Sequence, residues 1–144
     1  MVTIQLERVN GDYGFRATDE NGHSIQTDTS SENGSLGFGV RPMQAVLMAL
    51  GSCSAIDVVS ILKKQRQTPA AFSITIKGER EKDVVPALWK TIEMHFTLSG
   101  DIDEEKARKA CSLSVEKYCS VAETLRRAGA SIEWNLTVVS KQTA

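Results

Sequence analysis

The chain has 144 residues, of which 41% are hydrophobic and 24% charged, with a formal net charge of -1 at pH 7. This is the composition of an ordinary globular protein, and the length is sufficient to bury a real core, so we expect a single domain over residues 1–144. The net charge is close to zero and the sequence has no run of basic residues, so we expect no nucleic-acid partner.

The N-terminus and the cysteine count indicate the compartment. Residues 1–8 alternate like a strand and lack the charged and apolar blocks of a signal peptide. The 3 cysteines have no regular spacing, which is not the pattern of a disulfide framework and fits a reducing environment. We therefore expect a cytoplasmic protein.

The first elements in chain order are short strands. Asn10-Gly11 separates two alternating apolar segments, a strong β-hairpin signal, and Asn21-Gly22 turns the chain towards a third strand near Ile25. Residues 27–39 are polar and rich in glycine. No Gly-Lys-Ser/Thr follows them, so we predict a loop and not a phosphate-binding segment.

A long apolar helix is predicted from Pro42 to Leu62, with proline in the first turn, where its missing N–H has no intrahelical partner. The segment has about the ~20 residues that a bilayer requires. Because Gln44, Asp57 and three serines interrupt it, we predict no membrane span. A helix that is apolar on every side must be enclosed, so we expect a sheet or a partner chain around it.

Strands and helices then follow in separate groups. Alternation predicts strands over 72–76 and 88–98, and a last strand is marked by apolar residues between 132 and 138. Asp101 with Glu104 is a candidate cap for a helix with an apolar stripe, and Ser120-Val121-Ala122-Glu123 is a capping-box pattern that opens another. The stripe comprises Ala107, Ala110, Cys111, Val115 and Tyr118. Strands grouped apart from helices predict an α+β fold with antiparallel sheets.

Two cysteines have local settings that suggest dithiol redox chemistry. Cys53 lies in the middle of the long helix, and Cys119 lies just before a helix start, where the dipole favours a thiolate. Asp57, one turn after Cys53, would oppose thiolate formation there, so we assign it to a salt bridge or a polar network. Cys111 lies on an apolar stripe and is predicted to be packing. Neither histidine has metal-ligand spacing with a cysteine, so no metal site is predicted.

Two segments resemble the OsmC/Ohr family, and its YhfA-like branch most. They are Pro42-Met43-Gln44 through Ala49-Leu50-Gly51-Ser52-Cys53 into residues 55–62, and Glu116-Lys117-Tyr118-Cys119-Ser120-Val121. The resemblance implies an OsmC-like α+β fold with a long central helix, in an intertwined homodimer. It further implies reduction of hydroperoxides, with Cys53 as the peroxidatic cysteine, Cys119 as the resolving cysteine and an external dithiol as reductant. No bound cofactor is needed.

Such a site needs a cation, because a free thiol has its pKa well above 7 and is mostly protonated at neutral pH. In the family's peroxidases an arginine held by a glutamate does this. Arg16 and Arg41 are both candidates here, and the positions that match the glutamate are Met43 and Gln44. A neutral Gln44 supplies no charge-assisted contact. This departure favours the alternative to an enzyme, a dimer of the same fold that binds a small apolar ligand at its interface.

Overall fold

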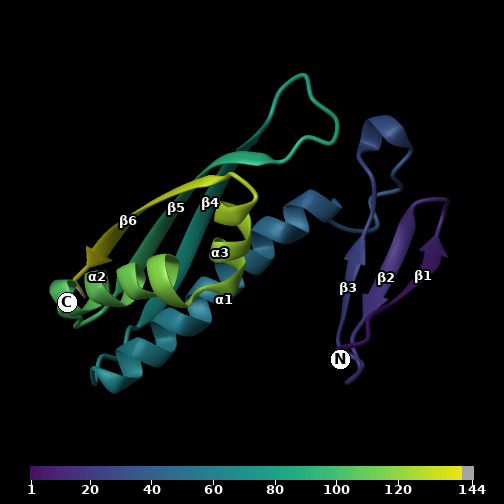
Figure 1. Ribbon diagram of the computed structural model, residues 1–144. Coiled ribbons are helices and arrows are strands. Elements are labelled where there is room, and N and C mark those ends of the chain that lie inside the picture. Colours follow the sequence, from purple (N-terminus) through teal and green to yellow (C-terminus); the bar gives the residue numbers. More distant parts are fainter. Residues whose placement is uncertain (141–144) are drawn as a thin grey trace. The chain divides into compact units, whose positions relative to one another are not determined.

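The computed structural model of the protein describes residues 1–140, shown as a ribbon in Figure 1. The chain forms two compact units, which divide between Met48 and Ala49. Each unit is described by itself below.

The first unit contains a three-stranded antiparallel sheet in the order β1-β2-β3, formed by β1 (Gln5–Asn10), β2 (Gly14–Thr18) and β3 (Ser24–Thr27). The predicted hairpin at Asn10-Gly11 is confirmed, and Gly11 has a φ of 56°, a left-handed conformation that glycine adopts without steric cost. The predicted loop carries only a short 3₁₀ turn, η1 (Ser31–Asn33).

Helix α1 (Pro42–Lys64) confirms the predicted helix and runs two residues further than expected. By length and composition alone it is apolar enough to cross a membrane. In the second unit it buries Leu50, Ser54, Val58 and Leu62, which recur every four residues and so form one stripe. Ile56, on another side of the helix, is 67% exposed in the single chain. The chain itself therefore covers one side of α1, and the predicted enclosure by a partner stays a prediction.

The second unit contains a sheet in the order β4-β5-β6, formed by β4 (Ala71–Arg80), β5 (Trp89–Ser99) and β6 (Ser131–Val139). Strands β4 and β5 form an antiparallel pair, as expected. Strands β5 and β6 pair in parallel, so the expectation of purely antiparallel sheets is wrong for this pair. The reason is the helical segment between them, which returns the chain to the end of the sheet where β5 began.

That connection consists of α2 (Glu104–Leu113), the π-helical turn η2 (Ser114–Tyr118) and α3 (Ser120–Arg127). Both predicted caps are displaced. Asp103, not Asp101, caps α2, because its carboxylate accepts the Lys106 N–H at 2.9 Å. Cys119, not Ser120, is the N-cap of α3. The predicted apolar stripe is buried except at its end, where Tyr118 is 52% exposed.

Helices α1, α2 and α3 lie on the same face of the β4-β5-β6 sheet (Figure 1). Strand β5 buries Ile92, Met94, Phe96 and Leu98 on one face, which confirms the predicted alternation. The Phe96 ring stacks on Phe72 at 6.4 Å and meets Trp134 edge-on at 6.1 Å. At Gly51 a Cβ would lie 2.9 Å from Ile76 Cδ1, so α1 packs closely on β4 here and a larger residue would require the end of the Ile76 side chain to shift.

Candidate functional site

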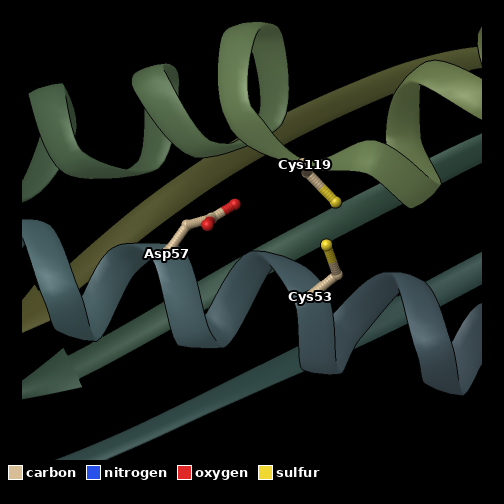
Figure 2. Close-up of side chains that lie close together, drawn as sticks. All are labelled: Cys53, Asp57 and Cys119. Carbon is tan, nitrogen blue, oxygen red and sulfur yellow. The ribbon is translucent and has the colours of Figure 1, made fainter.

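Two cysteines that are 66 positions apart in the sequence meet between α1 and the start of α3. The Sγ atoms of Cys53 and Cys119 and a carboxylate oxygen of Asp57 all lie within 4.8 Å of one another. Figure 2 shows the two thiol groups pointing toward each other, with Asp57 on the same side of α1 as Cys53. Both thiols are free, Cys53 half-buried and Cys119 buried.

The α1 part of the site follows from helix periodicity. Cys53 and Asp57 are separated by four residues, so they lie on one side of the helix, one turn apart. The neighbouring Gly51 lies close to Ile76 of β4, so this part of α1 packs against the sheet. The thiol and the carboxylate thus have a rigid support, which a loop would not provide.

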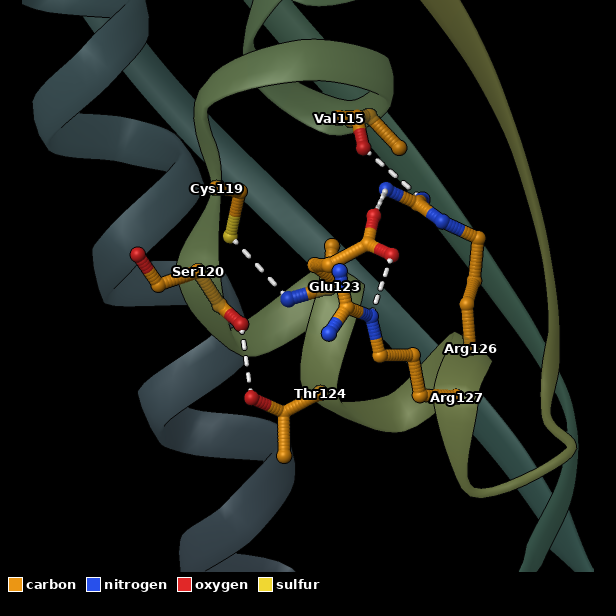
Figure 3. A network of polar contacts seen from close by, with 8 residues as sticks. Val115, Cys119, Ser120, Glu123, Thr124, Arg126 and Arg127 are labelled. Atoms are coloured by element: carbon orange, nitrogen blue, oxygen red, sulfur yellow. Dashed lines mark hydrogen bonds and ion pairs between the residues drawn. The ribbon is translucent and has the colours of Figure 1, made fainter.

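Cys119 is held by the backbone around it. Its N–H donates to the Ser114 carbonyl at 2.8 Å across the π-helical turn, and its Sγ accepts the Ala122 N–H at 3.4 Å (Figure 3). Burial raises the pKa of the Cys119 thiol, and the nearby Cys53 thiol adds to this, while the Ser54 hydroxyl and the Ala122 N–H lower it. The expectation that the helix start favours a thiolate is therefore wrong in its net direction, because desolvation outweighs the hydrogen bonds.

Asp57 belongs to a polar network, as predicted. The buried Ser114 hydroxyl lies 3.3 Å from Asp57 Oδ2 and 3.1 Å from the Ser54 carbonyl oxygen, so it can donate to either. Sequence reasoning missed Ser114, since it belongs to no motif. The one available signal was a polar residue next to Val115 and close to Cys111 on an otherwise apolar stripe.

The residues predicted to activate Cys53 belong to the first unit. Arg16 lies on β2, Arg41 immediately precedes α1, and Gln44 lies in the first turn of α1. The Gln44 side-chain oxygen accepts the backbone N–H of Arg41 at 3.3 Å, so this amide caps the helix start and does not hold a guanidinium group through that bond. The catalytic roles of these three residues stay predictions.

The arginines of α3 are paired with a carboxylate on their own helix. Glu123 Oε2 lies 3.4 Å from Arg126 and Glu123 Oε1 lies 3.1 Å from Arg127 (Figure 3). Hydrogen bonds from Arg127 and Arg126 lower the pKa of Glu123. Arg126 also donates to the Val115 carbonyl at 2.8 Å. The Arg126 contact ties α3 to the π-helical turn, and the single Glu123 carboxylate is shared by both guanidinium groups, so it offsets one of their two positive charges.

The third cysteine is separate from the pair. Cys111 is fully buried on α2, as predicted for a packing residue, and burial raises its pKa to about 12. Within residues 1–140, Cys53, Asp57 and Cys119 have the donor atoms and the proximity to hold a metal ion, although their sequence spacing gave no such indication.

Comparison with known proteins identifies a matching family and similar structures. The family model described as OsmC-like protein matches residues 32–135. The chain is 41% identical to Protein YhfA of Escherichia coli K12 over 115 residues, covering 79% of this chain and 82% of that protein. A hypothetical protein from Aquifex aeolicus has a similar crystal structure, with a TM-score of 0.83 and 28% identity, covering 99% of this chain and 98% of that chain. The organic hydroperoxide resistance protein OhrB of Bacillus subtilis shares the fold at 17% identity and a TM-score of 0.62, covering 95% of this chain and 98% of that chain.

Proposed function

The chain belongs to the OsmC-like protein family, and on that premise we propose that it is a thiol peroxidase that reduces organic hydroperoxides with Cys53 and Cys119. The proximity of the two Sγ atoms, within 4.8 Å, is the observation that carries the proposal. A disulfide has an S–S length of about 2.05 Å, so bond formation requires side-chain rotation and a small backbone adjustment but no refolding. The hydroperoxide-resistance name of the Bacillus subtilis structure supports the substrate class.

The roles follow from accessibility. Cys53 is half-buried and Cys119 is buried, so a peroxide reaches Cys53 more easily. The Cys53 thiolate attacks one oxygen of the O–O bond and becomes a sulfenic acid, and the other oxygen leaves as the alcohol after taking a proton. Cys119 then attacks the Cys53 sulfur, which gives a disulfide and releases water. An external dithiol reduces this disulfide and restores both thiols.

The pKa of Cys119 suits the second role. Because burial raises it, Cys119 stays protonated and unreactive until Cys53 has been oxidised. The Asp57 carboxylate lies beside both sulfur atoms and can accept the Cys119 proton when the disulfide forms. We assign the activation of Cys53 to Arg16 or Arg41. We further propose that the protein works as a homodimer in the cytoplasm.

One observation favours the alternative, a ligand-binding dimer without activity. Gln44, one of the two residues that can match the glutamate of the family's peroxidases, accepts the Arg41 backbone N–H with its side-chain oxygen. A site that lacks a positioned arginine would not activate Cys53, whereas the apolar and exposed side of α1 at Ile56 would still suit an apolar ligand or a partner chain.

Stopped-flow consumption of an alkyl hydroperoxide separates the two functions. The reduced wild-type protein is compared with Cys53→Ser, Cys119→Ser and, as a third-thiol control, Cys111→Ala. The peroxidase predicts that only Cys53→Ser abolishes the first step, that Cys119→Ser allows a single turnover, and that Cys111→Ala behaves like wild type. Consumption by Cys53→Ser at the wild-type rate would exclude the peroxidase, and no consumption by any of the four proteins would favour the ligand-binding dimer.

A further inference from the structure

The Cys53–Asp57–Cys119 cluster has the dimensions of a three-ligand metal site. Zinc binds thiolate sulfur at about 2.3 Å and carboxylate oxygen at about 2.0 to 2.2 Å, so the ligand atoms of a tetrahedral site lie roughly 3.3 to 3.8 Å apart. The three donor atoms here already lie within 4.8 Å of one another. Side-chain rotations that move each donor atom by less than one bond length would bring the atoms to the separations of a tetrahedral zinc site.

The donor types of the cluster also suit a cation. Metal binding displaces the thiol protons, and the two thiolates and the carboxylate would then offset the charge of the ion in one part-buried site. Within residues 1–140 no lysine, arginine or histidine forms an ion pair with Asp57. Thiolate ligands select zinc over magnesium or calcium, which prefer sites made only of oxygen.

Hydrogen bonds from outside the cluster orient two of the three donors. The Ser114 hydroxyl lies 3.3 Å from Asp57 Oδ2, and the Ala122 N–H donates to Cys119 Sγ at 3.4 Å. Such contacts fix the direction of ligands in protein metal sites. Structural zinc sites use four protein ligands, whereas three protein ligands leave one position for water or another small ligand.

We propose that the reduced protein binds one Zn²⁺ through Cys53 Sγ, Cys119 Sγ and the Asp57 carboxylate, with water in the fourth position. Zinc and the disulfide then exclude each other, because disulfide sulfur is no longer a thiolate ligand. This second part depends on the proposed function. One hydroperoxide with two protons oxidises the two zinc-bound thiolates to a disulfide and yields one alcohol, one water and one free Zn²⁺.

Zinc binding is tested without peroxide. Tag-free reduced protein is freed of metal and titrated with Zn²⁺ against a chromophoric chelator, and Co²⁺ is used as a spectroscopic probe. We expect one Zn²⁺ per chain and a thiolate-to-cobalt charge-transfer band. Cys53→Ser and Cys119→Ser should each weaken binding at least a hundredfold and reduce this band, and Asp57→Asn should weaken binding at least tenfold while keeping it. Cys111→Ala and Asp101→Asn are the matched controls and should bind like wild type, and circular dichroism verifies the fold of each variant.

Absence of binding at micromolar Zn²⁺, or unchanged affinity in either folded cysteine variant, would overturn the site. Unchanged affinity in folded Asp57→Asn would overturn the three-ligand assignment. In a second arm, the zinc-loaded protein receives one equivalent of alkyl hydroperoxide, and release of one Zn²⁺ per disulfide is expected. A disulfide formed without zinc release would refute the exclusion. If no disulfide forms even in the zinc-free protein, the peroxidase fails, while the titration still decides the metal site.

Discussion

Chemical labelling of Cys111 tests the raised pKa of this buried thiol. Burial raises the Cys111 pKa from its ordinary value of 9.0 to about 12. At pH 8 the thiolate fraction is then about 0.01%, compared with about 10% for a thiol of pKa 9, a ratio of roughly 1000. Since the thiolate is the species that reacts with iodoacetamide, alkylation of Cys111 in the folded protein should be about 1000-fold slower than in the unfolded chain. Its complete burial slows the reaction further.

The assay is timed alkylation at pH 8, followed by mass spectrometry of the cysteine-containing peptides in native and denatured protein. Cys53, which is half-buried, should be labelled first, and Cys119, which is buried with a raised pKa, second. The Cys111→Ala variant, labelled in parallel, should show unchanged rates at the other two thiols. If Cys111 in the native fold reacts within tenfold of its rate in the denatured chain, the packing of α2 described above is incorrect.

Four further results are expected. Gln44→Glu should speed the reaction with an alkyl hydroperoxide in stopped-flow experiments, because a carboxylate can hold an activating arginine through charge-assisted hydrogen bonds, and an unchanged or slower rate would count against that role. Phe96→Ala, which removes a fully buried ring from the core, should lower the free energy of unfolding by about 3 to 5 kcal/mol in a urea titration, and a loss below 1 kcal/mol would contradict its place there. Asp103→Ala should cost about 1 kcal/mol in the same assay, whereas Asp101→Ala should cost little, because only the former accepts the Lys106 N–H. Between pH 9 and 12 the Cys111 thiol loses its proton in the unfolded chain but keeps it in the folded one. The free energy of unfolding of the wild type should therefore fall with pH more steeply than that of Cys111→Ala, by up to about 1.4 kcal/mol per pH unit, and equal slopes would refute the raised pKa.

The parts of the fold that sequence predicts well are those with one buried face or a long apolar run. Strand β5 alternates between buried and exposed residues because one face is covered by helices, and this period of two is visible in the sequence. Helix α1 is equally evident, because its segment is long and mostly apolar. The fold class follows from the grouping of strands and helices, and it is confirmed as α+β.

Features that depend on distant contacts were not predictable locally. The sequence patterns indicated Asp101 and Ser120 as the helix caps, whereas the structure has Asp103 and Cys119 in these roles. The parallel pairing of β5 with β6 follows from the path of the whole helical connection. The π-helical turn depends on the Cys119 N–H reaching the Ser114 carbonyl, which no local pattern indicates.

The candidate site also combines features that the sequence predicts with features that depend on tertiary contacts. The periodicity of a helix predicts that Cys53 and Asp57 share a side of α1, and the resemblance to the family implied that Cys119 joins them. Ser114 was missed, because a buried serine has no motif of its own and its role depends on the contact with Asp57. The direction of the Cys119 pKa was predicted incorrectly, since the helix start was visible in the sequence while the degree of burial was not.

Mapping the disulfide formed by one equivalent of alkyl hydroperoxide tests the central claim most directly. The reduced protein is oxidised, remaining thiols are alkylated, and the peptides are identified by mass spectrometry. The geometry predicts a single intramolecular bond between Cys53 and Cys119, with Cys111 recovered in reduced form. A bond that includes Cys111, or three free thiols after complete consumption of the peroxide, would contradict the account.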